Sequence, residues 1–307
     1  MIVDKKEVRK NFINGSYVYY LENGGGIHGK LKNWKPGDPE REPAFTHIFK
    51  KEILGSSILF DIGANVGYYS FVAAQIMCEG KHGLIYAIEP DPRNVDLLKR
   101  GIKRNEYNEF VFPYEMGFSN KKGNIDFHLS KATNLSSTVK TEHSNNVVSI
   151  PVDTLNMFAY KNRIVKDNIF IRMDIEGHEV EVLQGAMTFL KKDFPCKIFM
   201  EVHPQFYWEA HSLERELQKL IRLGFTTKVV ISAAIAQPKL FAEHGYEPNQ
   251  VFDCGRFERG IYYGMSNEDA ISFASHQFRE DFDEVMINRS GETFSNKIVR
   301  SILLERK

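Results

Sequence analysis

Five continuous apolar runs, separated by amphipathic stretches, constrain the fold of this chain more than any other feature of its sequence. Strands in which apolar residues are continuous rather than alternating are typical of a parallel sheet buried on both faces. The stretches between them, such as "RNVDLLKRGIKRN" and "HEVEVLQGAMTFLKK", are amphipathic at helical spacing. The runs are "SSILFDIG" (56–63), "GLIYAIEP" (83–90), "FVFPYEMG" (110–117), "NIFIRMDIEG" (168–177) and "CKIFMEVHP" (196–204). This alternation predicts an α/β fold, with a mostly parallel sheet and helices on both faces.

Other segments flank or interrupt this pattern. We expect residues 1–52 to form an N-terminal extension of short strands and a helix at "AFTHIFKKEIL", which could act as a lid on the substrate side. Residues 53–265 are expected to form the main domain, and 266–307 a C-terminal addition that is partly helical. Within the main domain, "GNIDFHLS" and "NVVSIPVDTL" predict a two-strand insertion.

Composition argues against nucleic-acid binding, membrane insertion and a special role for the cysteines. The 307 residues include 40 Lys and Arg and 40 Asp and Glu, so no global field would attract nucleic acid or anionic lipid. The N-terminus lacks the apolar core of a secretion signal, and no apolar run approaches the roughly 18 residues of a membrane helix. Cys78, Cys196 and Cys254 form no C-x-x-C pair and are expected to be plain thiols. We therefore expect a cytoplasmic protein that neither spans a membrane nor binds nucleic acid.

Acidic side chains stand at the ends of four of the five runs. A carboxylate after a strand commonly caps the next helix, so each of these acids, considered alone, could be a helix cap instead of a ligand-binding residue. Ligands of open α/β sheets bind outside the carboxyl ends of the strands, where these acids would converge. The residues concerned are Asp61, Glu89, Asp174, Glu176, Glu201 and, beside the last acid, His203. Their convergence favours a ligand site over capping.

The glycine spacing after the first run indicates which ligand. Dinucleotide folds use G-x-G-x-x-G, whereas this chain has D-x-G-x-x-x-G from Asp61 through Gly63 to Gly67. The carboxylate of Asp61 would lie where a dinucleotide places its pyrophosphate, and the two negative charges would repel each other. A ligand that carries an ammonium and a sulfonium and lacks phosphate fits better, which predicts S-adenosyl-L-methionine. Glu89, at the end of the next run, would then accept hydrogen bonds from the ribose hydroxyls.

Five ordered motifs lie within residues 53–232: "FDIGANVGYYS", "IYAIEPDPRNVDLLKRGIKRN", "IPVDTLNMF", "IRMDIEGHEVEVLQGA" and "IFMEVHP". Together they resemble the FkbM family of S-adenosylmethionine-dependent methyltransferases. The resemblance implies a class I, Rossmann-like methyltransferase that methylates hydroxyl groups of sugars, polyketides or related small molecules. This chain departs from the family at Arg172, where Lys is usual, and at Asn156, where Asp is frequent.

The resemblance also implies a set of cofactor-binding residues. The methionine part of the cofactor would lie at the loop after the first run, its ribose at the end of the second, and its adenine near Met116 and Gly117. Met116 has plain core packing as an equal alternative. The full set is Asp61, Gly63, Ala64, Asn65, Gly67, Tyr68, Glu89, Pro90, Asp91, Asn94, Met116, Gly117 and Asp174.

Catalysis needs a group that removes the proton of the acceptor hydroxyl, because the sulfonium methyl is already electrophilic. The candidates are Asp174, Glu176, Glu201 and His203. We expect Glu176 or His203 to be the base, and Asp174 to hold the cofactor amine or the acceptor. The same donors, with His178, could bind a divalent ion, but their spacing matches no known ligand signature and we expect no metal. The loop "NLSSTV" (134–139) could close over the acceptor.

Two other function classes compete with this prediction. A nicotinamide oxidoreductase is disfavoured by the missing G-x-G-x-x-G, and because no Tyr is followed four residues later by Lys. A non-catalytic module that only binds the cofactor would have no need of the acids at the methyl end. The sequence therefore predicts an S-adenosylmethionine-dependent O-methyltransferase acting on a sugar, a glycan or a small natural product.

Overall fold

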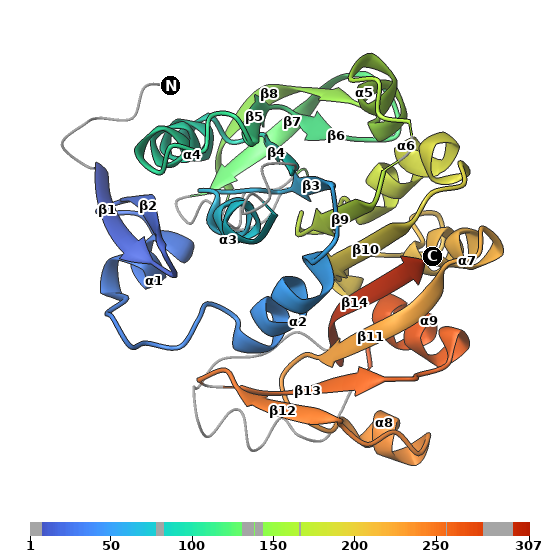
Figure 1. Ribbon diagram of the computed structural model, residues 1–307. Coiled ribbons are helices and arrows are strands. Elements are labelled where there is room, and N and C mark those ends of the chain that lie inside the picture. Colours follow the sequence, from blue (N-terminus) through green and yellow to red (C-terminus); the bar gives the residue numbers. More distant parts are fainter. Residues whose placement is uncertain are drawn as a thin grey trace.

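A nine-stranded sheet forms the centre of the computed structural model, which describes residues 8–77, 83–130, 138, 144–165, 167–255, 257–278 and 297–307 (Figure 1). Its strand order is β12-β13-β11-β14-β10-β9-β3-β4-β5. The five predicted runs form its parallel part. These strands are β3 (Ile58–Ile62), β4 (Leu84–Glu89), β5 (Val111–Glu115), β9 (Ile169–Met173) and β10 (Cys196–Glu201). Every residue of β3 and β9 is buried, as continuous apolar runs predict.

Helices cover both faces of this sheet, which confirms the predicted architecture. Side chains alternate along a strand, so Leu59 packs on one face of β3 and Phe60 on the other. The first face is covered by α2 (Pro43–Ile53), α3 (Tyr68–Met77) and α4 (Pro92–Arg104). The second is covered by α5 (Leu155–Lys161), α6 (Glu179–Leu190), α7 (Leu213–Arg222), α8 (Lys239–Glu243) and α9 (Asn267–Ser275).

The C-terminal strand is the main departure from the sequence prediction. A helix was expected after Asn267, and α9 is there, but β14 (Val299–Arg306) was not predicted. It lies antiparallel between β10 and β11 (Thr226–Ser232), inside the sheet rather than beside it. Its apolar residues also fit helical spacing, so only pairing with a strand on each side decides its conformation. The antiparallel pair β12 (Gln250–Asp253) and β13 (Glu258–Tyr263) completes that edge.

The N-terminal residues form a hairpin and two helices. The hairpin pairs β1 (Val8–Ile13) with β2 (Ser16–Leu21), and it is followed by α1 (Ile27–Asn33), which was not predicted. Asn105, at the end of α4, holds the hairpin: its side chain accepts from the Tyr17 amide at 2.8 Å and donates to the Tyr17 carbonyl at 2.9 Å.

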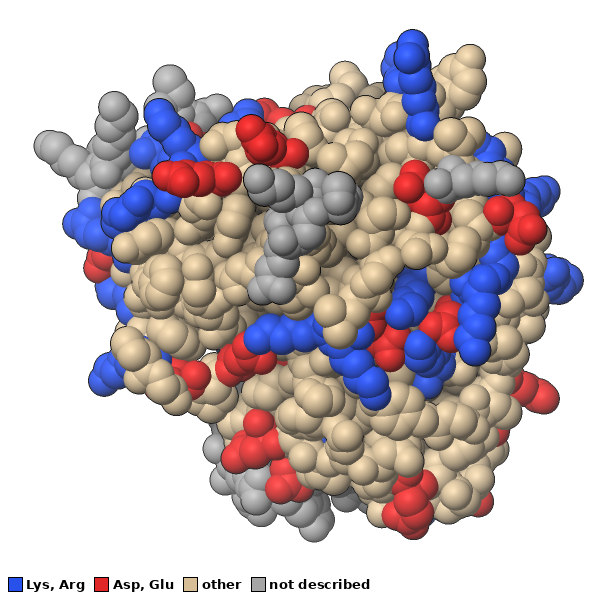
Figure 2. All heavy atoms as spheres, in the orientation of Figure 1, with Lys and Arg blue, Asp and Glu red and all other residues tan. Residues whose placement is uncertain are grey.

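The predicted insertion is present as a small separate sheet. It joins β6 (Gly117–Phe118), β7 (Gly123–Ser130) and β8 (Ser144–Asp153) in the order β6-β8-β7. A short 3-10 helix, η2 (Pro204–Phe206), follows β10. None of the helices in the described part of the chain has the length and apolar character needed to cross a bilayer. Figure 2 shows basic and acidic side chains interspersed over one face, so that face carries no extended patch of one sign.

Candidate active site

Two cavities open where β3, β4, β9 and β10 end. The first encloses about 620 Å³ and is lined mainly by apolar side chains of these strand ends and of the β6–β8 sheet. The second encloses about 940 Å³ and is lined mainly by polar and charged side chains. Four residues line both cavities: Gly63, Asn65, Asp174 and Glu176. The two cavities therefore meet at the predicted site.

The loop after β3 is shaped by two glycines with positive φ. A Cβ on Gly63 (φ +79°) would lie 2.1 Å from the carbonyl oxygen of Asp174, so only glycine lets this loop approach the turn after β9. A Cβ on Gly67 (φ +91°) would lie 2.5 Å from Leu98 Cδ1, which explains the close packing of α3 on α4. Gly63 faces both cavities, whereas Gly67 lies on the walls of neither.

Glu89 ends β4 on the wall of the first cavity. Its carboxylate accepts from the Asn65 amide at 2.7 Å, from the Asp91 amide at 2.9 Å and from Asn94 Nδ2 at 3.3 Å. Burial and, secondarily, the charge of Asp91 raise the pKa of Glu89 to about 7. Asp91 caps α4 by accepting from the Arg93 amide at 3.0 Å.

The structure separates the predicted cofactor residues into two groups. One group lines one or both cavities: Gly63, Ala64, Asn65, Tyr68, Glu89, Pro90, Gly117 and Asp174. The other is set back from their walls: Asp61, Gly67, Asp91, Asn94 and Met116. Met116 packs against the main apolar core.

Asp61 is fully buried and holds Arg172, its neighbour in the register of β3 and β9. Asp61 accepts from Ser70 Oγ at 2.6 Å and from Arg172 Nη1 at 3.1 Å. Arg172 also donates to the Gly63 carbonyl at 2.9 Å and to Asp174 Oδ2 at 2.8 Å. Burial opposes the charge of Arg172, but Asp61 and Asp174 outweigh it and raise the pKa of the guanidinium. Sequence analysis noted Arg172 only as a departure from the family and missed this bridge.

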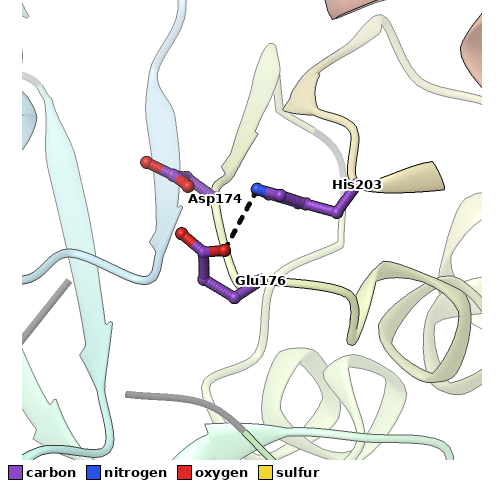
Figure 3. Close-up of side chains that lie close together, drawn as sticks. All are labelled: Asp174, Glu176 and His203. Atoms are coloured by element: carbon purple, nitrogen blue, oxygen red, sulfur yellow. Dashed lines mark ion pairs between the residues drawn. The ribbon is translucent and has the colours of Figure 1, made fainter. Parts of the chain in front are cut away.

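The four predicted catalytic residues meet at the junction of the cavities. His203 Nε2 lies 3.5 Å from Glu176 Oε2 and 3.3 Å from Glu201 Oε1. Figure 3 shows His203 directed toward Glu176, with Asp174 beside them. Asp174 and Glu176 come from the turn after β9, and His203 from the segment after β10. Alternation after β10 puts Glu201 and His203 on one side, as predicted.

A fifth acid, Glu179, was missed. It is the first residue of α6 and is fully buried. Its carboxylate lies 2.8 Å from His203 Nδ1 and accepts from the Tyr207 hydroxyl at 2.9 Å. At the start of a helix it looked like an ordinary N-terminal acid. The signal in the sequence was its place in D-x-E-G-x-E, directly after the turn that carries Asp174 and Glu176.

These contacts give His203 and Glu176 different protonation states. Burial alone would lower the pKa of His203, but the carboxylates of Glu176 and Glu179 outweigh it and raise that pKa to about 10. Burial raises the pKa of Glu176 to about 7, against the opposing effect of His203. Near neutral pH His203 is therefore an imidazolium, while Glu176 exchanges its proton readily.

Two basic residues from the C-terminal segment complete the cluster. Lys297 Nζ lies 3.2 Å from Glu201 Oε1, and Arg300 pairs with the same carboxylate. Burial opposes the ionisation of Glu201, but Arg300 and Lys297 outweigh it and hold its pKa well below the usual range. Both basic residues line the second cavity. Nothing in the local sequence pattern indicated them.

Asp174, Glu176 and His203 each place one potential metal-ligand atom within 4.8 Å of the others. A histidine that binds a metal must be neutral, because the imidazolium has no free lone pair. In this structure His203 lies within ion-pair distance of Glu176, Glu179 and Glu201, and its buried Nε2 forms no hydrogen bond to the described residues. His178 lies apart from it: its Nε2 is 3.2 Å from Ser119 Oγ and its Nδ1 3.2 Å from Thr138 Oγ1.

Two further predictions concern residues only partly described. Of the loop 134–139, Thr138 is described and lines the first cavity, and the rest lies outside the described residues. Cys78 also lies outside them. Cys196 and Cys254 are free thiols. Burial raises the pKa of Cys196 to about 12, which makes it a poor nucleophile.

Comparisons with known proteins relate this chain to a methyltransferase family. Residues 61–227, more than half of the chain, match the methyltransferase FkbM domain. Over 172 residues the chain is 29% identical to the hexuronic acid methyltransferase AglP of Haloferax volcanii, a match that covers 55% of this chain and 66% of that protein. The match thus spans slightly less than two thirds of that relative.

Similar solved structures include methyltransferase FkbM of Methylobacillus flagellatus, with 18% identity over 68% of this chain and 44% of that chain, at a TM-score of 0.36. They also include an O-methyltransferase of Bacillus cereus in complex with SAH, with 11% identity over 67% and 80% of the two chains, at a TM-score of 0.38. On the match to residues 61–227, this chain belongs to the FkbM family of methyltransferases, whose cofactor is S-adenosyl-L-methionine.

Proposed function

We propose that this protein transfers the methyl group of S-adenosyl-L-methionine to a hydroxyl group of a sugar, within a glycan or a small natural product. The observation that carries the proposal is Glu176, which lies at the junction of an apolar and a polar cavity and has a pKa raised to about 7. A carboxylate of that pKa suits proton removal from a hydroxyl near neutral pH. The relative that methylates hexuronic acid supports a sugar as the acceptor. Membership of a methyltransferase family argues against the nicotinamide oxidoreductase.

The residues of the first cavity fit the cofactor. Gly63 forms a cradle that a Cβ would fill, and Glu89 offers a buried carboxylate on the wall. We propose that Gly63 and Asn65 hold the methionine part and Glu89 the ribose, while Phe118 and Gly117 flank the adenine. Residues set back from the walls act indirectly: Asp61 through Arg172, and Asp91 and Asn94 through Glu89.

The chain's own residues then perform the proton transfer. The cofactor supplies an electrophilic methyl group on a sulfonium. Glu176 would take the proton of the acceptor hydroxyl as that oxygen receives the methyl group in exchange for the sulfonium sulfur. Asp174, held by Arg172, orients the acceptor or the cofactor amine. His203, pinned between Glu176, Glu179 and Glu201, positions Glu176 as an imidazolium and does not itself accept the proton.

The test is methyl transfer from labelled S-adenosylmethionine to a panel of neutral and acidic oligosaccharides. We expect a product one methyl group heavier, in which two-dimensional NMR correlates the new methyl protons with a ring carbon through an ether oxygen. A correlation to a carboxyl carbon or to nitrogen would show that the methyl group is transferred to a carboxylate or an amine, and would contradict O-methylation of a hydroxyl. Cofactor binding without transfer to any member of the panel would favour the non-catalytic module.

The cofactor affinity should depend on pH through Glu89. The raised pKa of about 7 means that the free protein carries a proton on Glu89 below neutrality. Ribose hydroxyls donate to the ionised carboxylate, so binding releases this proton and affinity rises with pH. We expect up to about tenfold tighter binding of S-adenosylhomocysteine per pH unit between about pH 5.5 and 7, with a plateau above. Calorimetry in two buffers of different ionisation enthalpy measures the proton released. Glu89→Gln should bind S-adenosylhomocysteine more weakly and with an affinity that no longer depends on pH. If the affinity of this variant still depended on pH, another group would be the source of the dependence.

A further inference from the structure

We propose that the acceptor is an acidic oligosaccharide, and that a third cavity beside the second one holds the sugar unit next to the methylated unit, with Arg41 binding its carboxylate. This inference rests on the proposed function and names the class of its acceptor. The third cavity encloses about 790 Å³ and is lined by α1, by the segment that follows it and by the start of α3. Nothing in the sequence pattern had indicated it.

The second and third cavities adjoin, because three residues line both. Both are lined by Ile27, Arg41 and Tyr68. A single sugar unit placed at Glu176 would leave the third cavity unfilled. We therefore assign one of two linked units to each cavity.

Arg41, which lines both cavities, has unused hydrogen-bonding capacity. Among the residues that the structure describes, no oxygen accepts a hydrogen bond from its guanidinium, and its Nε is buried without a partner. Its nearest carboxylate, Glu42 Oε2, is 3.9 Å away. Glu42 is already engaged, because it accepts from Arg300 at 2.7 Å and from the Tyr69 hydroxyl at 3.2 Å.

A guanidinium whose Nε is buried without a hydrogen bond is costly, and the planar carboxylate is the group whose two oxygens match its fork of donors. Lys30 lines the same cavity and, among the described residues, forms no ion pair, so it adds a second positive charge. Two acids also line the cavity: Asp38, which accepts from the Lys35 amide at 2.7 Å, and Glu42, which is engaged by Arg300. The unused donors on this wall are those of Arg41, and the carboxylate of a sugar acid is the group that matches them. A neutral sugar would leave the guanidinium without its partner.

The third cavity also has an aromatic wall suited to carbohydrate. Trp34 is partly buried there, and its indole Nε1 has no partner among the described residues. Tyr68 lines both cavities, and its hydroxyl accepts from Asn14 Nδ2 at 2.7 Å. Tyr and Trp combine an apolar body with a polar tip, as a sugar ring with C–H faces and hydroxyl edges requires.

Tryptophan fluorescence tests the proposal directly. The chain has two tryptophans, Trp34 and Trp208, and the second is 61% exposed and stacks on His211 outside these cavities. In Trp208→Phe, Trp34 is the sole reporter. With the protein saturated in S-adenosylhomocysteine, we expect trigalacturonic acid to change the Trp34 emission with a dissociation constant at least about tenfold below that of galacturonic acid. Maltotriose, the neutral trimer, should bind at least about tenfold more weakly than trigalacturonic acid.

Variants of one arginine on this wall and one outside it provide the matched comparison. In the Trp208→Phe background, Arg41→Ala should weaken trigalacturonic acid at least about tenfold, and Arg41→Lys less. Arg100→Ala, which removes an arginine paired with Asp96 on α4, should leave it unchanged. The proposal is overturned if trigalacturonic acid does not bind, or if it binds no more tightly than galacturonic acid or maltotriose. It is also overturned if Arg41→Ala and Arg100→Ala have equal effects on the binding of trigalacturonic acid. Calorimetric titration of the same samples with S-adenosylhomocysteine shows whether each variant is folded. If the protein methylates a neutral glycan but does not bind trigalacturonic acid, this inference fails while the proposed function stands.

Discussion

Replacing Glu176 by Gln is expected to lower kcat by about 10²–10⁴-fold, the usual contribution of a general base, while the affinity for S-adenosylhomocysteine and the melting temperature barely change. Glutamine keeps the shape and hydrogen-bonding reach of the side chain but cannot take the proton. Steady-state kinetics on the acceptor found by the methyl-transfer screen measures the effect. In the unsubstituted protein, kcat should rise with pH through about 7, because the active form of Glu176 is the ionised one.

Two variants separate this role from its alternatives. Glu181→Gln is the matched control, since Glu181 lies in α6, pairs with His211 at 2.9 Å and lines neither cavity. It should keep full activity. His203→Asn should lower kcat and shift the pH profile, since the imidazolium lowers the pKa of Glu176. If Glu176→Gln remained active and lost about 1 kcal/mol of stability instead, the residue would act as part of the turn before α6.

Replacing Arg172 by Met is expected to cost about 3–5 kcal/mol of unfolding free energy, because it leaves buried carboxylates without their counter-charge. Asp61 is fully buried and Arg172 is its ion-pair partner at 3.1 Å. The same change frees Asp174 at the junction of the cavities. Unfolding in urea, followed by circular dichroism in the absence of cofactor, measures the loss.

The matched variant is Arg172→Lys. It keeps the charge but not the fork that reaches Asp61, the Gly63 carbonyl and Asp174 together, so we expect a smaller loss of stability. The double variant Asp61→Asn, Arg172→Met should recover part of the loss, since no unpaired charge is then left at position 61. An Arg172→Met protein as stable as the original would show that the buried pair makes no such contribution.

The sequence alone was sufficient for the parallel half of the sheet and for its acidic edge. Continuous apolar runs predicted β3, β4, β5, β9 and β10, and the position of Asp174, Glu176 and His203 just past two of those strands predicted that they would meet. These features depend on local periodicity and on the rule that parallel strands end at one edge, and both can be read from a single segment at a time.

Only the tertiary structure decided which groups surround those acids and how they ionise. Arg300 reaches Glu42 across 258 positions of sequence, and Lys297 reaches Glu201 across 96. The strand β14, which brings Arg300 there, has an apolar pattern that fits a helix equally well until it pairs with β10 and β11. Coulombic interaction and desolvation depend on distances and burial that no local pattern contains. For this reason the residue types of the site were predictable from the sequence. The imidazolium of His203, the raised pKa of Glu176 and the buried Arg41 Nε, which has no hydrogen bond to the described residues, were not.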